Sequence, residues 1–212
     1  MRLLDLFCGA GGAAMGYHRA GFDVVGVDIK PQPHYPFEFH QGDALEYLAE
    51  HGREFDAIHA SPPCQAFSMA GQQWRKAGRE YPDFIEATRS LLRKTGKPYV
   101  IENVPGSPLK NPIMLNGAMF GKRVNRRRYF ECHPTMPFIL IPPDPPSRFR
   151  MGRPVKEGDQ ITPVGHFSNI PYARKEMDID WMTGAEMTQA IPPAYTHFIG
   201  RQLIAQIERG AA

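Results

Sequence analysis

The feature that most constrains this fold is a regular alternation of short apolar runs with longer helix-like segments. Runs at 2–7 (RLLDLF), 23–29 (DVVGVDI), 55–60 (FDAIHA) and 98–104 (PYVIENV) have the length and composition of buried strands. They are separated by about 15 to 35 residues. This order is typical of a parallel sheet flanked by helices. The sequence therefore predicts an α/β fold with a mostly parallel sheet and helices on both faces.

The length of the chain and its termini limit what can be attached to this sheet. A chain of 212 residues favours one domain with a small appendage. Residues 13–20 are expected to form a helix ended by Gly21, and residues 192–209 a terminal helix. Prolines punctuate residues 134–163, so we expect an extended excursion or loop there.

Composition and cysteine usage indicate a globular protein of a reducing compartment. Hydrophobic residues make up 42% of the chain and charged residues 22%. No apolar stretch approaches the roughly 20 residues of a membrane span, and the N-terminus runs into the first strand without a signal peptide. Three cysteines are too few, and odd in number, for a disulfide framework. We expect a cytoplasmic protein with free thiols and no membrane partner.

Polar groups follow the first three strands where a cofactor would bind. Gly9, Gly11 and Gly12 follow the first strand, Asp28 ends the second about 20 residues later, and Asp43 follows the third. Ligands bind at the carboxyl edge of parallel sheets, and a carboxylate there accepts hydrogen bonds from ribose hydroxyls. The pattern therefore predicts a cofactor of the nucleoside type.

Cys64 and Glu102 are the candidates for chemistry. The fourth strand leads into SPPCQAFS, where two prolines stiffen the loop in front of Cys64, whereas Cys8 and Cys132 are expected to be structural. Glu102 ends the fifth strand at the same edge of the sheet. A thiol beside a carboxyl group predicts a nucleophile with a proton donor.

Taken together, the motifs resemble those of the DNA cytosine-5 methyltransferases. They are DLFCGAGG at 5–12, Asp28, Asp43, PPCQAFS at 62–68, ENV at 102–104, Arg126 with Arg128, and QAIPPAY at 189–195. The resemblance implies a Rossmann-like, S-adenosylmethionine-dependent methyltransferase in a compact form. It further implies double-stranded DNA as the substrate and methyl transfer to carbon 5 of cytosine.

The resemblance also implies a role for each matching residue. Cys64 would add to carbon 6 of cytosine, and Glu102 would act at ring nitrogen 3. Arg126 would contact the carbonyl oxygen of the base, with Arg128 supporting the loop. S-adenosylmethionine would be held by Phe7, Gly9, Gly11, Asp28, Ile29, Asp43, Ala44 and Pro62, and no metal is expected.

A target base inside a duplex must be extruded into the site. Residues 66–81, which contain Trp74 and several basic residues, are expected to form the loop that closes on DNA. The positive charges at 122–128 fit DNA binding and a merely solvated face about equally.

The resemblance divides the chain into a catalytic core at 1–130, a reduced, proline-rich target-recognition region at 131–187, and a C-terminal helical segment at 188–212 that completes the cofactor pocket. Two positions depart from the family pattern: Val124 replaces the usual glutamine of the arginine motif, and Gln189 stands three residues before the proline pair instead of an asparagine two before it. The candidates for DNA contacts in the recognition region are Arg148, Arg150, Arg153, His166 and Asn169. So short a region predicts a short or relaxed target sequence.

Three alternatives use the same residues differently. A transfer-RNA cytosine-5 methyltransferase would need the same Cys64 and Glu102. A catalytically silent nucleic-acid-binding module is disfavoured because both residues are present. The third alternative is a catalytic subunit whose sequence specificity comes from a separate chain. We expect a monomer instead.

Overall fold

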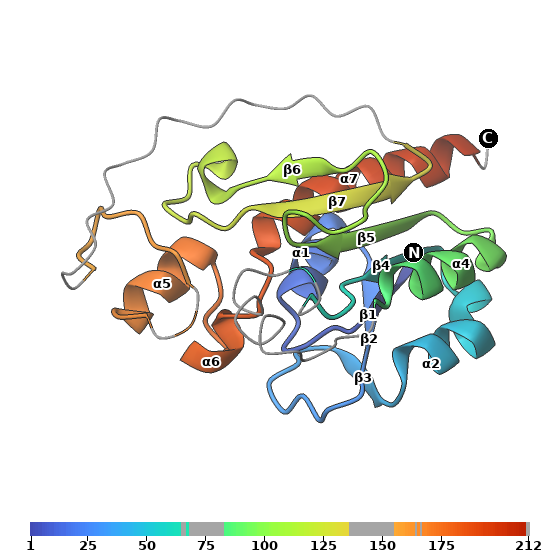
Figure 1. Ribbon diagram of the computed structural model, residues 1–212, viewed down its shortest axis with the longest axis horizontal. Coiled ribbons are helices and arrows are strands. Elements are labelled where there is room, and N and C mark those ends of the chain that lie inside the picture. The colour runs from blue at the N-terminus through green and yellow to red at the C-terminus, as the bar shows by residue number, and fades with distance from the viewer. Residues whose placement is uncertain (65–66, 68–82, 136–154, 164, 166, 211–212) are drawn as a thin grey trace.

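One seven-stranded sheet forms the centre of the computed structural model, which describes residues 1–64, 67, 83–135, 155–163, 165 and 167–210 (Figure 1). The strand order is β3-β2-β1-β4-β5-β7-β6. In chain order the strands are β1 (Arg2–Leu6), β2 (Asp23–Asp28), β3 (Glu38–Gln41), β4 (Ala57–Ala60), β5 (Tyr99–Asn103), β6 (Ile113–Leu115) and β7 (Arg128–His133).

The first five strands are parallel, as the alternating pattern predicts. Leu4 of β1 pairs with Val25 of β2 on one side and with Ile58 of β4 on the other. β7 runs antiparallel to β5, with Glu102 opposite Phe130, and β6 pairs antiparallel with β7. All five parallel strands therefore present their carboxyl ends at one edge, and β1 lies beside β4 at the point where the strand order reverses.

Helices cover both faces of the sheet, which confirms the predicted fold class. Helices α1 (Gly12–Ala20) and α7 (Pro193–Gly210) pack on one face in an apolar cluster that includes Tyr17 and Ile199. Helices α2 (Ala44–His51) and α4 (Ile85–Thr95) pack on the other, with Leu48 and Leu92 in a second cluster. Two short 3₁₀ helices, η1 (Gly52–Glu54) and η3 (Gly117–Phe120), complete these layers.

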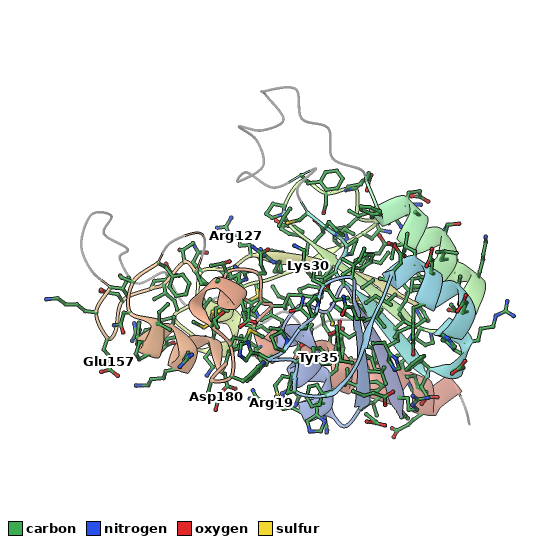
Figure 2. All side chains as sticks on the ribbon, turned by 90° about the horizontal axis from the view of Figure 1, so that it is seen from below. Arg19, Lys30, Tyr35, Arg127, Glu157 and Asp180 are labelled. Atoms are coloured by element: carbon green, nitrogen blue, oxygen red, sulfur yellow. The ribbon has the colours of Figure 1, made fainter. Side chains whose placement is uncertain are left out.

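A third unit lies at one end of the sheet, within the region expected to recognise the target. It contains α5 (Ile170–Met177) and α6 (Gly184–Met187), and both views place it to one side of the strands (Figures 1 and 2). Its own apolar cluster includes Val124, Tyr172 and Met187. The proline-rich composition did not predict these helices, because their stability comes from this packing more than from a local pattern.

The expected boundary between residues 130 and 131 falls inside β7. Glu131 is buried there and forms a bidentate ion pair with Arg89 of α4, in which both N–O distances are 2.8 Å. Cys132, expected after the strand, lies within it, and burial raises the pKa of its thiol to about 12. Among the helices of the described ranges, none is long and apolar enough to cross a membrane.

Candidate active site

Cys64 and Glu102 lie at the ends of adjacent parallel strands. Cys64 follows β4 after Pro62 and Pro63, and Glu102 is the penultimate residue of β5. Asn103 holds the two segments together, because its side-chain amide donates to the carbonyl of Pro62 at 3.0 Å while it is itself 1% exposed. The stiff loop is therefore fixed directly to the strand that carries Glu102.

The Glu102 carboxyl is buried, and charged or polar groups surround it. Arg128 Nε lies 2.9 Å from Glu102 Oε1 as an ion pair whose alignment falls short of a hydrogen bond. Ser61, the residue after β4, lies beside Glu102 in the parallel register of β4 and β5. Burial raises the pKa of Glu102, and Arg128, Arg126 and Ser61 oppose the increase. Burial therefore favours the protonated form of this carboxyl group more than water does.

The Cys64 thiol is half-buried beside this carboxyl. Burial raises its pKa first, and the nearby Glu102 raises it further, whereas Arg128 and Arg126 lower it. The free protein therefore holds Cys64 mainly as a thiol, and neutralisation of Glu102 would make its ionisation easier.

The two arginines of the motif occupy different surroundings from those expected. Arg126 is 3% exposed, and its two terminal nitrogens donate to the carbonyls of Pro163 and Thr188 at 2.9 and 2.8 Å. Burial lowers its pKa to about 9. Arg128, expected to support the loop, is the one that contacts Glu102. In the free protein Arg126 therefore ties segments of the chain together and Arg128 lies beside Glu102, and the contact of Arg126 with the base stays a prediction.

The glycine loop and Asp28 form one structure at the end of β1 and β2. Gly9 and Gly11 adopt positive φ angles of 50° and 83°, which glycine tolerates best. Asp28 Oδ2 accepts from the Gly9 amide and Oδ1 from the Lys30 amide, both at 3.0 Å. A carboxylate oxygen accepts more than one hydrogen bond, so Asp28 retains acceptor capacity for a ribose.

Two apolar side chains border this loop. Ile29 is 66% exposed directly after β2, although large hydrophobic residues are mostly buried elsewhere in the described chain. Phe7, at φ 56°, is half-buried at the end of β1. An added side-chain carbon at Gly9 would meet no atom of the described residues within 4 Å, so those residues leave the loop backbone open on that side. Apolar groups around an open glycine loop fit an adenosine-type cofactor.

The structure gives Asp43 a local role that the sequence analysis missed. Its Oδ1 accepts from the amides of Leu45 and Glu46 at 2.8 and 3.1 Å and so caps α2. An aspartate directly before a helix is a signal for such a cap. Asp43 is exposed and Ala44 is buried beside it, at the same edge as Asp28.

Three further residues near the glycine loop or at contacts between distant segments belong to none of the sequence motifs. Trp181, from the segment between α5 and α6, donates its indole N–H to the carbonyl of Ala10 at 2.8 Å and so contacts the glycine loop. His34 Nδ1 lies 2.9 Å from Glu186 Oε1 of α6. Figure 2 labels Tyr35, whose ring covers Gly26 of β2. These contacts join distant parts of the chain, so no sequence spacing could predict them.

Some expected DNA contacts lie outside the described residues. They include nearly all of the 66–81 loop, Arg148, Arg150, Arg153 and His166. Asn169, the remaining candidate base contact, caps α5 through its side-chain oxygen and donates to the carbonyl of Val155. Among the residues that the structure does describe, no three His, Cys, Asp or Glu side chains form a metal site.

Residues 1–112, slightly more than half of the chain, match the model of the C-5 cytosine-specific DNA methylases. The chain belongs to this family. The match covers the glycine loop, Cys64 and Glu102, and the family uses S-adenosylmethionine as its methyl donor. The resemblance stated from the motifs is thereby confirmed.

Individual relatives are similar to part of this chain. The type II methyltransferase M1.HphI of Haemophilus parahaemolyticus is 36% identical over 123 residues, which cover 48% of this chain and 32% of the relative. M.XorII of Xanthomonas oryzae pv. oryzae is 34% identical over 119 residues, covering 49% and 28%. The chain therefore spans about a third of the length of these curated relatives.

One solved structure is similar along the whole chain. A putative DNA modification methyltransferase encoded within an E. coli prophage superposes with a TM-score of 0.65 at 16% identity, covering 98% of this chain and 99% of that one. At this identity the likeness concerns the fold alone. It includes the α5–α6 unit, so this compact architecture is found in another solved protein.

Proposed function

We propose that this methylase transfers a methyl group from S-adenosylmethionine to carbon 5 of cytosine in double-stranded DNA through a covalent Cys64 adduct. The observation that carries the proposal is the placement of Cys64 and Glu102 on adjacent strand ends, with Arg128 2.9 Å from the carboxyl. A nucleophile, a carboxyl group with a raised pKa and a fixed cation are what addition to a cytosine ring requires.

The chain's own groups would act in sequence. Cys64 loses its thiol proton to solvent, its sulfur forms a bond to carbon 6, and the electron pair of the 5,6 double bond moves through the ring toward nitrogen 3. Glu102 gives nitrogen 3 its proton, and Arg128 stabilises the resulting carboxylate. When bound, S-adenosylmethionine supplies the methyl group that carbon 5 takes up. A base then removes the carbon 5 proton, the 5,6 double bond forms again as the Cys64 thiolate leaves, and nitrogen 3 returns its proton to Glu102.

The cofactor would occupy the glycine loop between β1 and β2. Asp28 would accept from the ribose hydroxyls, and Phe7 and Ile29 would contact the adenine. Gly9 and Gly11 would admit the ligand close to the backbone, with Asp43, Ala44 and Pro62 at the same edge. The open side of Gly9 and the exposure of Ile29 support this placement.

The test uses DNA that contains 5-fluorocytosine, because fluorine at carbon 5 blocks the final elimination. We expect a denaturation-resistant protein–DNA adduct with wild-type protein and S-adenosylmethionine, and none with Cys64→Ser. Cys132→Ser is the matched control, since Cys132 lies in β7 and should leave the adduct unchanged. Absence of any wild-type adduct would contradict covalent catalysis.

The same preparations separate DNA from RNA as the acceptor. We expect Cys64-dependent methylation of duplex DNA and none of transfer RNA. Methylation of transfer RNA alone would contradict DNA as the substrate, but it would still agree with the proposed chemistry of Cys64 and Glu102. Cofactor binding by Cys64→Ser, measured by calorimetry, should stay near wild type because the proposed cofactor contacts come from other residues.

A further inference from the structure

A chain of buried hydrogen bonds leads from helix α1 to the reactive carboxyl. The Tyr17 hydroxyl lies 2.9 Å from His59 Nδ1, and His59 Nε2 lies 2.9 Å from Ser61 Oγ. Ser61 and Glu102 come directly after the paired residues Ala60 and Ile101 of the parallel strands β4 and β5, so their side chains lie side by side on one face. Ser61 lowers the pKa of Glu102 as a hydrogen-bond donor does. Tyr17 and His59 are both fully buried, so this chain runs through the core beneath the site.

The chain has a direction, which Tyr17 determines. Among the described residues, the Tyr17 hydroxyl has a single hydrogen-bond partner, His59 Nδ1. If Tyr17 accepted a hydrogen bond there, its own proton would be left unpaired in the core, which is costly. Tyr17 therefore donates to Nδ1.

The remaining donors follow from this choice. Burial lowers the pKa of His59 to about 3, so the ring is neutral and carries its single proton on Nε2. That proton is donated to Ser61 Oγ, which leaves the Ser61 hydroxyl proton for Glu102. All three donors thus point toward the carboxyl group.

We propose that Tyr17, His59 and Ser61 form a positioning relay that stabilises the carboxylate form of Glu102 and so makes it a stronger acid toward the target base. This inference rests on the proposed function for the role of Glu102 in the reaction. A hydrogen bond donated to the ionised form favours it, and each bond in a buried chain polarises the next. The relay would therefore act when Glu102 gives up its proton.

Other charged groups around Glu102 must be kept constant in a test. Arg128 on β7, Arg126 in the preceding loop and Cys64 after β4 all face it. Ser61→Ala removes one hydroxyl and leaves the Arg128–Glu102 ion pair in place. This variant isolates the contribution of the relay.

The groups around His59 are Tyr17 on α1 and Asp5, which lies opposite it on β1. Asp5 is fully buried, and among the described residues neither of its oxygens has a hydrogen-bond partner. Burial raises its pKa well above the usual value, which favours the uncharged form beside His59.

The experiment measures the titration of Glu102 in the free protein by ¹³C NMR of labelled glutamate carboxyl groups, with Glu102→Gln to assign the signal. We expect the midpoint to rise by about one pH unit in Ser61→Ala, the effect of losing a hydrogen bond to an ionised group. A midpoint equal to that of wild type would overturn the relay.

Two His59 variants test the step behind Ser61. His59→Leu removes the donor to Ser61, and we expect a smaller rise in the Glu102 midpoint. His59→Gln restores an amide donor, and the midpoint should return to the wild-type value. If His59→Leu does not fold, the Glu102 midpoints of His59→Gln and Ser61→Ala still decide whether His59 belongs to the relay. A midpoint in His59→Gln as high as in Ser61→Ala would exclude His59 from the relay.

A kinetic measurement then links the relay to the reaction. On the acidic plateau of the pH–rate profile, kcat of Ser61→Ala should fall about tenfold with KM for the cofactor unchanged, since one pH unit corresponds to a factor of ten. The alkaline limb of the profile should move to higher pH by the same amount as the Glu102 midpoint. A shifted midpoint with unchanged kcat would overturn the relay's role in catalysis. Wild-type protein that methylates no DNA would refute the proposed function, whereas the titration would still decide whether the relay exists.

Discussion

At the scale of single residues, we expect Arg126 to stabilise the fold and Arg128 to act in methyl transfer, although both belong to one motif. Arg126→Ala would leave the buried carbonyl of Pro163 and the partly buried carbonyl of Thr188 without this donor. We expect it to lower the free energy of unfolding by about 2–4 kcal/mol. Arg128→Ala should leave stability near wild type and instead reduce methylation, because Arg128 neighbours Glu102. Urea denaturation and a methyl-transfer assay separate the two effects.

Arg127 provides the matched control, because it is exposed between the two residues (Figure 2). Arg127→Ala should change the free energy of unfolding by less than about 0.5 kcal/mol. Equal stability of Arg126→Ala and Arg127→Ala would show that the buried guanidinium does not tie these segments together.

His59 makes stability depend on pH in a direction that can be worked out. Its pKa is about 3 in the folded protein and near 6.5 when unfolded, so the unfolded chain binds the extra proton between these values. Relative to His59→Gln, wild-type protein should therefore keep its full stability above about pH 6.5 and lose up to about 1.4 kcal/mol per pH unit below it. Urea unfolding of both proteins at several pH values measures the difference. A constant difference across that range would contradict a buried, neutral His59.

At the scale of elements, helices α1 and α7 approach closely enough that one position admits no side chain. A side-chain carbon at Gly16 would lie 2.0 Å from Thr196 Oγ1 and 2.2 Å from the carbonyl oxygen of Pro193. Although alanine favours a helix more than glycine does, we expect Gly16→Ala to lower the free energy of unfolding by about 2–3 kcal/mol. Gly42→Ala is the control, because the added carbon there meets nothing within 4 Å. Equal denaturation midpoints would contradict this packing.

The same packing connects the two ends of the sequence. Pro193 begins α7 and belongs to the final motif, while α1 directly follows the glycine loop. Displacement of α7 should therefore weaken S-adenosylmethionine binding as well as stability, and calorimetry on Gly16→Ala measures this second effect.

At the scale of the whole molecule, we propose that the 131–187 region reads only a short target. Each base pair read directly needs at least one side chain at a base edge, at about 1–3 kcal/mol for a good bidentate contact. Of the candidates there, Asn169 is engaged in capping α5. We expect a recognition sequence of about two to four base pairs. Bisulfite sequencing of plasmid DNA from expressing cells measures it, and methylation confined to a site of six or more base pairs would contradict it.

Single substitutions distinguish arginines that contact base edges from arginines that contact phosphates. Arg148→Ala, Arg150→Ala and Arg153→Ala should each relax specificity at one position if the side chain reads a base. A phosphate contact would instead weaken binding uniformly and reduce its salt dependence. Gel filtration with and without DNA tests whether a second copy or another chain takes part.

The sequence by itself determined most of the parallel sheet and the family to which the chain belongs. The period of the apolar runs predicted four of the parallel strands and both flanking layers, because burial on two faces requires that pattern. The motifs placed Cys64, Glu102 and Asp28 at one edge, because parallel strands end together there. These inferences needed only local order along the chain.

Only the tertiary structure decided which groups touch. Contacts between residues up to 62 positions apart set the surroundings of Arg126 and the hydrogen bonds from Tyr17 through His59 to Ser61. The capping role of Asp43 likewise appears only in the folded chain. The α5–α6 unit likewise exists because Val124, Tyr172 and Met187 bury one another. Such contacts are set by how the layers pack, and packing leaves no periodic signal in the sequence.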